Sequence, residues 1–544
     1  MILKKNSTKQ KLLGAYYTPV KLANEMIKLC SMKNVHSILE PSCGDGVFVD
    51  ALRDLKKIQI VDEIDAIEVD KTAAQIVQSK YHNFDNVNVH VADFYKYYNE
   101  INNIKSYDLI VGNPPYIRYQ FLKKSQKDEQ SKILTSCGMK SNQLINAWVA
   151  FVVASVNLLS DKGHIALVIP AEILQVAYAE DLRLFLTNNL GKITLITFKE
   201  LVFPDIQQET LVLIGEKSSS ESKIRIIQLN NLNDFEKLNL NNYPFQKMHH
   251  VKEKWTKYFV SDDDVSLISK IRSDNRFTKF SELGVINIGI TTGNNSFFSV
   301  TDDIAKEYDL KNISIPLIGR SSHANGIYFT KNDWKENLKQ SKRARLVNYP
   351  DKEINEFTKK QQEYILNGED DGVNKGFKCS IRDRWYVLPS VWVPDAFFLR
   401  RNNLYPKFVI NKCKAVSTDT MHRIKFNDDI DEDTILLSYY NSITFAFTEI
   451  CGRSYGGGVL EILPGELGNV ALPIIKNIDL KKKMELLNQI DEIVRNNDDI
   501  EKALDLVDQN ILIDMLGVTP ETCTKFREIW KTMQHRRLAR GKNL

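Results

Sequence analysis

The chain of 544 residues exceeds one ordinary domain, and about 150 residues per domain predicts two to four of them. The composition, with 43% hydrophobic and 26% charged residues, is typical of a soluble globular protein and excludes a disordered or fibrous one. The net charge of +4 is too small to identify a partner, and the seven scattered cysteines contain no Cys-x-x-Cys pair, so we expect reduced thiols and no metal site.

The sequence predicts neither a secretion signal nor a membrane segment. Met1–Lys5 runs directly into polar residues, without the apolar core of a signal peptide. The most apolar stretch, 144–159, contains Asn146 and Ser155 and is shorter than the ~20 residues needed to cross a bilayer. We expect a buried helix there and a cytoplasmic protein.

The first predicted element is a helix over residues 21–30, where apolar residues recur at helical spacing. Thr18 followed by Pro19 predicts an N-cap with proline at the first helical position.

A short strand near residues 36–40 then leads into a turn that contains Gly44 and Gly46. Glycines at such a turn let the backbone approach a ligand closely. The turn lacks the G-x-G-x-x-G phosphate pattern, and Glu40 would repel a phosphate. An acid here better suits a ligand with a cationic amino group or sugar hydroxyls.

Two later strands also end in acids. Glu68 lies in the stretch 64–70 that ends the second strand, at the position where such sheets hold ribose hydroxyls. Asp93 follows the strand 87–91 and could accept from an adenine amino group, with Phe94 packed on the ring. Each acid taken alone could instead be a strand-end cap or a solvated carboxylate.

The fourth strand, 107–112, ends in Asn-Pro-Pro-Tyr at 113–116. The prolines stiffen the turn, so that the Asn113 amide oxygen and the Pro114 carbonyl can face one point beside the Tyr116 ring. An exocyclic amino group is a poor nucleophile because its lone pair is delocalised into the ring. Two acceptors would localise that lone pair for attack on an electrophilic methyl group. The alternative is a proline-rich turn that only closes a strand.

The polar stretch 123–142 predicts a mobile surface loop. After it, strands alternate with helices and a closing pair of strands follows, which predicts a doubly wound, mostly parallel Rossmann-like α/β sheet. The further strands are expected at 165–170, 193–197 and 210–214, and a further helix at 179–186.

The second half of the chain is basic and rich in aromatic residues, above all between residues 376 and 425. Cations for phosphates and flat faces for bases suit a nucleic-acid surface, although the aromatics could be core and the cations a solvated face. Residues 479–516 predict a packing helix, and the tail at 535–542 predicts a disordered basic segment that touches phosphates.

Taken in order, these motifs resemble the gamma-group amino-methyltransferases, the adenine-specific DNA methyltransferases of restriction-modification systems. The match covers the Tyr-Thr-Pro helix, the Glu-Pro-x-Cys-Gly-x-Gly loop, the acid after the second strand, Ala-Asp-Phe and Asn-Pro-Pro-Tyr. The second half is more loosely similar to a TaqI-like specificity domain, through Gly289–Phe298 and the triple glycine 456–458.

The resemblance implies S-adenosylmethionine as the cofactor and a role for each site residue. The Asn-Pro-Pro-Tyr turn would hold the target amino group, and Tyr116 and Phe203 would stack on a base flipped out of the duplex. The residues expected to bind the cofactor are Thr18, Glu40, Pro41, Ser42, Cys43, Gly44, Glu68, Asp93, Phe94 and Pro115. The residues expected to contact DNA are Arg382, Arg384, Lys407, Lys412, Arg453 and Tyr455.

The resulting expectation is a site-specific, adenine-specific DNA methyltransferase that acts on double-stranded DNA, with a separate restriction endonuclease as a possible partner and a monomeric state. Its predicted parts are a catalytic domain (1–243), a mixed α+β DNA-recognition domain (244–475) and a helical C-terminal extension with a basic tail (476–544). The alternatives are a methyltransferase for cytosine, RNA or protein glutamine, and a DNA-binding module without catalysis.

Overall fold

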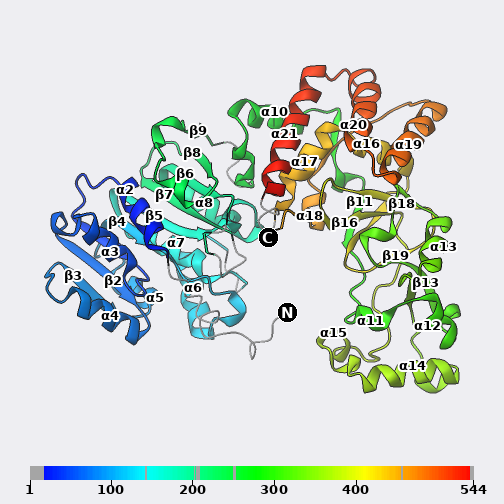
Figure 1. Cartoon of the computed structure of the whole chain (residues 1–544), viewed down its shortest axis with the longest axis horizontal. Helices are drawn as coiled ribbons and strands as arrows, with labels where there is room; N and C mark the ends of the chain where they lie inside the picture. Colours follow the sequence, from blue (N-terminus) through cyan, green and yellow to red (C-terminus); the bar gives the residue numbers. More distant parts are fainter. Residues whose placement is uncertain are drawn as a thin grey trace. The chain divides into compact units, whose positions relative to one another are not determined.

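The computed structural model describes residues 18–140, 144–200, 202–203, 209–248, 253–454 and 457–539, with only the backbone of residue 177. These residues form two compact units. Unit 1 ends at Val265, and unit 2 begins at Ser266. Each unit has its own sheets and helices (Figure 1).

Unit 1 is built on one nine-stranded sheet in the order β3-β2-β1-β4-β5-β7-β6-β8-β9. The pairs from β3 to β5 are parallel, whereas β7 runs antiparallel to both β5 and β6. The predicted doubly wound, mostly parallel α/β sheet is therefore confirmed. The strands are β1 (Ser37–Glu40), β2 (Glu63–Glu68), β3 (Val87–Val91), β4 (Tyr107–Gly112), β5 (Leu159–Pro170), β6 (Leu190–Phe198), β7 (Thr210–Lys217), β8 (Lys223–Leu229) and β9 (Gln246–Lys247).

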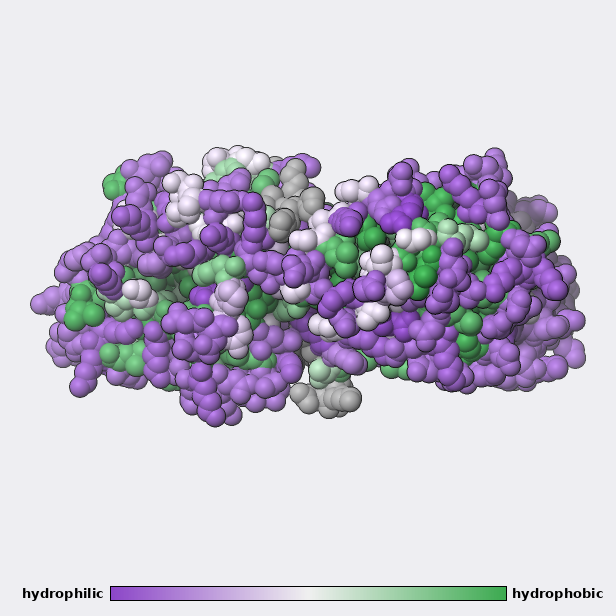
Figure 2. All heavy atoms as spheres, turned by 90° about the horizontal axis from the view of Figure 1, so that it is seen from above, coloured by the Kyte–Doolittle hydropathy of each residue, from purple (hydrophilic) through white to green (hydrophobic). Residues whose placement is uncertain are grey.

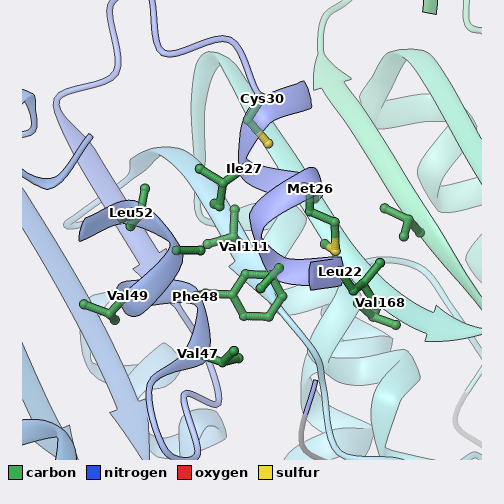
Figure 3. Packing of buried hydrophobic residues seen from close by; sticks show 14 of the residues in the cluster. Leu22, Met26, Ile27, Cys30, Val47, Phe48, Val49, Leu52, Val111 and Val168 are labelled. Carbon is green, nitrogen blue, oxygen red and sulfur yellow. The ribbon is translucent and has the colours of Figure 1, made fainter. Parts of the chain in front are cut away.

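Helices cover both faces of this sheet. On one face, Leu22 and Met26 of α2 pack with Phe48 of α3 over Val111 and Val168 of the sheet (Figure 3). Side chains alternate along a strand, so the residues next to Val111 and Val168 point to the other face, where α7 lies against β5. The helices are α2 (Val20–Leu29), α3 (Val47–Asp54), α4 (Lys71–Tyr81), α5 (Phe94–Ile101), α6 (Lys124–Ser136), α7 (Ala147–Asn157), α8 (Glu180–Asn189) and α9 (Leu232–Phe235).

The stretch predicted as a mobile loop at 123–142 is largely the helix α6, so that prediction is wrong. Gln130, Ile133 and Leu134 share one face of the helix and are buried. The Gln130 amide also donates to the carbonyl of Ile145. The narrow apolar face is hidden in the sequence by the many Lys, Ser and Gln residues around it. Residues 141–143 lie outside the described part of the chain.

Unit 2 mixes small sheets with helices. Its strand orders are β11-β20-β16-β18-β14, β12-β15-β13-β19, β17-β22-β21 and β10-β23. The strands are β10 (Phe277–Lys279), β11 (Gly284–Ile288), β12 (Ser299–Val300), β13 (Ser314–Ile318), β14 (Tyr328–Phe329), β15 (Arg345–Val347), β16 (Ala396–Leu399), β17 (Arg401–Asn402), β18 (Phe408–Asn411), β19 (Val416–Ser417), β20 (Met421–Phe426), β21 (Arg453–Ser454), β22 (Leu460–Glu461) and β23 (Ala471–Pro473).

The helices of the second half begin with α10 (Asp262–Arg272), which spans the point where the two units meet in sequence. The others are α11 (Asn295–Phe298), α12 (Asp302–Glu307), α13 (Lys331–Lys339), α14 (Lys359–Asp370), α15 (Phe377–Ser380), α16 (Glu432–Tyr439), α17 (Ser442–Cys451), α18 (Pro464–Leu467), α19 (Leu480–Arg495), α20 (Ile500–Val507) and α21 (Pro520–Ala539).

The predicted disordered tail is wrong as far as residue 539, because His535–Ala539 belong to α21. Arg537 is 1% exposed and forms a buried ion pair of 2.7 Å with Glu449 of α17. Its guanidinium also donates to the carbonyls of Asn403 and Gly458. Arg537 is therefore part of the packing of unit 2, whereas residues 540–544 lie outside the described chain.

None of the helices described is both long and apolar enough to cross a membrane. Hydrophilic side chains cover most of the face shown in Figure 2.

Candidate active site

Four neighbouring strands carry the predicted site residues to one edge of the sheet in unit 1. The strand β1 pairs in parallel with both β2 and β4, and β2 pairs in parallel with β3. Their carboxyl ends therefore meet at one edge, which is where open α/β sheets bind ligands. Glu40, Glu68, Asp93 and Asn113 stand at or directly after these four ends.

Glu40 is a buried acid at this edge, with 2% of its surface exposed. Its Oε2 atom has no hydrogen-bond partner among the described residues. Burial raises the pKa of Glu40 well above its usual value, and the carboxylates of Asp45, Asp50 and Glu68 raise it further. A buried carboxylate oxygen in such a position can accept from a cationic amino group. The methionine moiety of S-adenosylmethionine carries such a group, so the residues present fit this cofactor.

Glu68 joins the loops that follow β1 and β2. Its Oε2 accepts from the backbone N–H of Gly44 at 2.8 Å, and its Oε1 accepts from that of Asp70 at 2.8 Å. The turn between β1 and α3 also needs its glycines, since Gly44 and Gly46 have φ values of 56° and 87°. Each carboxylate oxygen retains acceptor capacity beyond these bonds. The predicted ribose contact therefore remains compatible with this geometry.

Asp93 and Phe94 both have structural contacts. Asp93 is the N-cap of α5, and its Oδ1 accepts from the backbone N–H of Tyr95 at 3.0 Å. This is the strand-end cap that the sequence left open as the alternative. Phe94 is buried, and its ring centroid lies 4.9 Å from that of Phe151. The predicted contacts of both residues with the adenine of the cofactor stay predictions.

The Asn-Pro-Pro-Tyr turn is fixed to the neighbouring loops by side chains. The Ser42 hydroxyl donates to the backbone carbonyl of Asn113 at 3.2 Å. The side-chain amide nitrogen of Asn113 donates to the Thr18 hydroxyl at 3.1 Å. The second contact orients the carboxamide with its oxygen directed away from Thr18. The structure thus brings the turn together with Thr18 and with the loop after β1.

Tyr116 is 7% exposed, and its hydroxyl donates to the Val168 carbonyl of β5 at 3.1 Å. Burial holds the pKa of this phenol well above its usual value, so the group stays neutral at physiological pH. Its ring is therefore fixed against the next strand of the sheet.

The predicted N-cap role of Thr18 is wrong. The helix α2 starts at Val20 with Pro19 as its N-cap residue, and no side chain caps it. The Thr18 hydroxyl is used instead as an acceptor for Asn113. Phe203, the second predicted stacking residue, is 5% exposed and belongs to the core that contains Leu22 and Met26. Its predicted contact with the target base stays a prediction.

Residues missed by the sequence interpretation lie beside the turn. The Asn146 Oδ1 accepts from the backbone N–H of Tyr119 at 3.2 Å, and the Asn146 amide donates to the Tyr178 hydroxyl at 3.2 Å. The Tyr178 hydroxyl in turn donates to Glu172. Glu172 follows the end of β5 at the same edge of the sheet, so the pattern of acids after strands that identified Glu40 and Asp93 could also have identified it.

The residues predicted to contact DNA mostly have partners inside unit 2. Arg384 pairs with Asp351 and Glu353, and Lys412 pairs with Glu432 and Asp433. The Arg453 guanidinium lies 2.6 Å from Glu466.

The remaining two described members of this set, Arg382 and Lys407, donate to backbone carbonyls. Burial lowers the pKa of Lys407 to about 8. Tyr455 lies outside the described residues. The DNA-binding role of the whole set stays a prediction.

Comparison with known proteins shows which protein families the chain matches. The family model described as N-6 DNA Methylase matches residues 1–284, and the model described as Type II methyltransferase M.Eco57I, C-terminal domain, matches residues 252–512.

The chain is 26% identical over 528 residues to the Type II methyltransferase M.AccI of Acinetobacter calcoaceticus, an alignment that covers 92% of this chain and 93% of the relative. It is 27% identical to the Type II methyltransferase M.HindII of Haemophilus influenzae, over 58% of this chain and 61% of the relative. Among solved structures, the type IIG restriction endonuclease BpuSI is similar with a TM-score of 0.43 and 15% identity, over 97% of this chain and 66% of that chain.

Proposed function

The chain belongs to the N-6 DNA methylase family, and from that premise we propose that the turn 113–116 is the catalytic element with which it methylates the exocyclic amino group of adenine in DNA. The observation that carries the proposal is the fixed position of Asn113 between Thr18 and Ser42, at the edge where β1, β2, β3 and β4 end. The same edge carries Glu40, the buried acid that fits the amino group of the cofactor.

The turn acts on the target through two acceptors and a ring. The Asn113 side-chain oxygen and the Pro114 carbonyl accept the two amino hydrogens of adenine, which localises the nitrogen lone pair. S-adenosylmethionine supplies an electrophilic methyl group. Once methylated, the amino nitrogen is acidic enough to lose a proton without a dedicated base. Thr18 and the residues 40–44, 68, 93–94 and 115 hold the cofactor.

Adenine must leave the duplex to reach this turn, at a cost of a few kcal/mol. Stacking on the Tyr116 ring offsets part of this cost, at about 1–3 kcal/mol per aromatic contact. The Tyr116 hydroxyl bond to Val168 keeps the ring in one orientation, so little further ordering is needed when the base arrives. Phe203 provides the second aromatic face in this proposal.

The rest of the chain supplies DNA recognition. We assign residues 1–243 to catalysis, 244–475 to recognition of the target sequence and 476–544 to a helical extension. The match of residues 252–512 to the C-terminal domain of a Type II methyltransferase supports the assignment of a role other than catalysis to this part of the chain. Since relatives are named Type II methyltransferases, we further propose a restriction endonuclease that acts separately, a monomeric methyltransferase and a cytoplasmic location.

The test is the Asn113→Ala variant. We expect transfer of labelled methyl groups to duplex DNA to fall by at least about a hundredfold, because a preorganised acceptor at the reacting atom is lost, while DNA affinity stays within about threefold. The exposed Asn99 of α5 offers a matched control, Asn99→Ala, which should keep full activity. Undiminished transfer by Asn113→Ala would contradict the proposal. Methylation-sensitive sequencing of DNA from expressing cells would identify the recognised site.

A further inference from the structure

Unit 2 contains a cavity of about 500 Å³ whose lining residues are mainly polar or charged, and none of the predicted site residues lines it. It lies at one edge of the sheet β12-β15-β13-β19. The parallel strands β13 and β19 end at this edge, and the antiparallel strand β15 begins there. Arg320 follows β13, Thr418 follows β19, and Lys342 and Arg343 precede β15. The topology thus brings Arg320 together with the consecutive cations Lys342 and Arg343, which lie more than twenty residues further along the chain.

The cavity also uses a motif that the catalytic site leaves unexplained. Asn295 and Ser296 of the Gly289–Phe298 motif line it, as does Ser299 directly after the motif. Asn294 caps α11 by accepting from the backbone N–H groups of Ser296 and Phe297, which fixes this side of the cavity. The motif therefore forms one wall of the cavity, and the side chains that it contributes to this wall are polar.

Among the described residues that line the cavity there is no Asp or Glu. Arg320 and Arg343 are exposed, and among the described residues neither they nor Lys342 forms an ion pair. The Lys342 ammonium instead donates to the neutral amide of Asn337 at 2.9 Å. This differs from the predicted DNA-contacting residues Arg384, Lys412 and Arg453, whose charges are balanced by carboxylates of the same unit.

Two buried neutral groups, His323 and Ser299, complete the lining. The Nδ1 atom of the buried His323 accepts from the backbone N–H of Gly319 at 3.3 Å, which places the ring proton on Nε2. Burial and the charges of Lys342 and Arg320 lower the pKa of His323 to about 4, although a hydrogen bond to the Leu317 backbone partly offsets this, so the ring is neutral at physiological pH and its N–H already has an acceptor. The hydroxyl of Ser299 is buried and has no hydrogen-bond partner among the described residues. An unmet buried hydroxyl costs free energy that a bound acceptor would recover.

We propose that this cavity binds backbone phosphates of the DNA substrate, with Arg320 and Arg343 as the charged contacts and Ser299 as a neutral donor. A phosphodiester has a negative charge and acceptor oxygens only, which complements a lining of cations and donors. Such contacts hold the duplex in register but carry no base sequence. The inference rests on the proposed action on DNA and adds the surface that anchors the duplex.

The test compares the double variant Arg320→Ala/Arg343→Ala with the full-length wild type in DNA binding at several salt concentrations. Each phosphate contact contributes about 0.9 to the slope of log K against log salt. We expect the slope to fall by about one to two, and the affinity at low salt to fall at least about tenfold. The loss should be equal for duplexes with and without the recognised site. Both arginines are exposed, so melting temperatures should match.

Lys481→Ala/Lys482→Ala is the charge-matched control, because Lys481 and Lys482 are exposed cations at the start of α19 and do not line the cavity. It should leave the salt slope unchanged. A graded variant, Arg320→Glu, should weaken binding more than Arg320→Ala does.

A wild-type salt slope in the double variant would overturn the inference. So would tight binding of free inorganic phosphate that the double variant abolishes without a change in DNA binding, since the cavity would then be a site for a free anion. The wild type must first bind and methylate DNA. If it does neither, the proposed function fails, whereas a failure of the double variant alone to change DNA binding refutes only the phosphate site.

Discussion

At the scale of single residues, Glu40 is expected to affect both the stability of the fold and the binding of the cofactor, and measurements at two pH values separate these effects. Its pKa is higher in the folded chain than the usual value of about 4.5. The contribution of Glu40 to the free energy of unfolding is therefore fully present below pH 4.5, and it is lost as the pH rises toward the pKa of the folded state. A bound cationic amino group reverses this loss, because it favours the charged carboxylate.

We expect the Glu40→Gln variant to be more stable than the wild type at high pH but to bind the cofactor less tightly. Without cofactor, the variant should melt higher than the wild type near pH 8 and should lose this advantage near pH 5, where Glu40 is neutral as well. Its affinity for S-adenosylmethionine should fall roughly 10- to 100-fold, as about 1.5–3 kcal/mol is lost with a hydrogen bond to a charged group. Thermal denaturation with and without cofactor at both pH values measures both. The exposed Glu100→Gln should show neither effect.

Thr18 carries a second prediction at this scale. Thr18→Val keeps the shape of the side chain but removes the hydroxyl that accepts from the Asn113 amide. With the carboxamide less well oriented, kcat should fall about tenfold, which corresponds to about 1.4 kcal/mol. Thr18→Ser should restore most of the rate, because it restores the acceptor. A wild-type rate constant for methyl transfer by Thr18→Val under single-turnover conditions would show that the contact does not matter for catalysis.

The residue scale also shows what the sequence could and could not predict. Glu40, Glu68, Asp93 and Asn113 were predictable because each follows a recognisable strand, and parallel strands bring their ends together. The hydrogen bond between Thr18 and Asn113 was not, because nothing in the local pattern distinguishes a hydroxyl that caps a helix from one that contacts a loop far along the chain. The pairing of Arg384 with Asp351 and Glu353 is hidden for the same reason.

At the scale of elements, the βαβ pattern predicted the sheet of unit 1, whereas two polar helices were mistaken for loops or tails. In α6 and at the end of α21, few apolar residues face the core, and buried polar residues do part of the packing. Gln130 bonds to a backbone carbonyl and Arg537 to a buried acid. Hydrophobic periodicity cannot detect such contacts, because the side chains involved are polar.

The ion pair between Arg537 and Glu449 joins α21 to α17 and gives a prediction for these elements. Glu449 is 5% exposed, and burial raises its pKa, which the Arg537 charge partly offsets. Arg537→Met leaves a buried carboxyl without its partner and should lower the free energy of unfolding of unit 2 by about 3–5 kcal/mol. Chemical denaturation measures this loss.

The double variant Arg537→Met/Glu449→Leu removes both charges and should recover most of that stability. Arg527→Met is not a suitable control, since Arg527 pairs with Asp508. Exposed Lys525→Met, which removes a surface pair with Glu528, should change stability by less than about 1 kcal/mol. Equal losses for Arg537→Met and Lys525→Met would show that the α21 pair is not a structural contact.

At the scale of the whole molecule, the two units are expected to divide the reaction between them. Unit 1 holds the residues that are proposed to act on the methyl group and the target nitrogen, and the proposed phosphate cavity lies in unit 2. Ordered motifs made the first unit recognisable from sequence. The second unit was predicted only as basic and aromatic, because its short strands pair in an order that the sequence does not reveal.

This division predicts that defects in the two units combine independently. Thr18→Val acts through Asn113, and Arg320→Ala/Arg343→Ala acts through the cavity, so in the described part of the chain the altered residues share no hydrogen-bond partner. The loss in kcat/KM of the combined variant should therefore equal the product of the two separate losses, within about twofold, since additivity holds within about 0.3–0.5 kcal/mol for independent sites. Steady-state methylation of a duplex with one target site measures all three values. A combined loss much smaller than the product would mean that DNA held by unit 2 and the catalytic turn act as one coupled site.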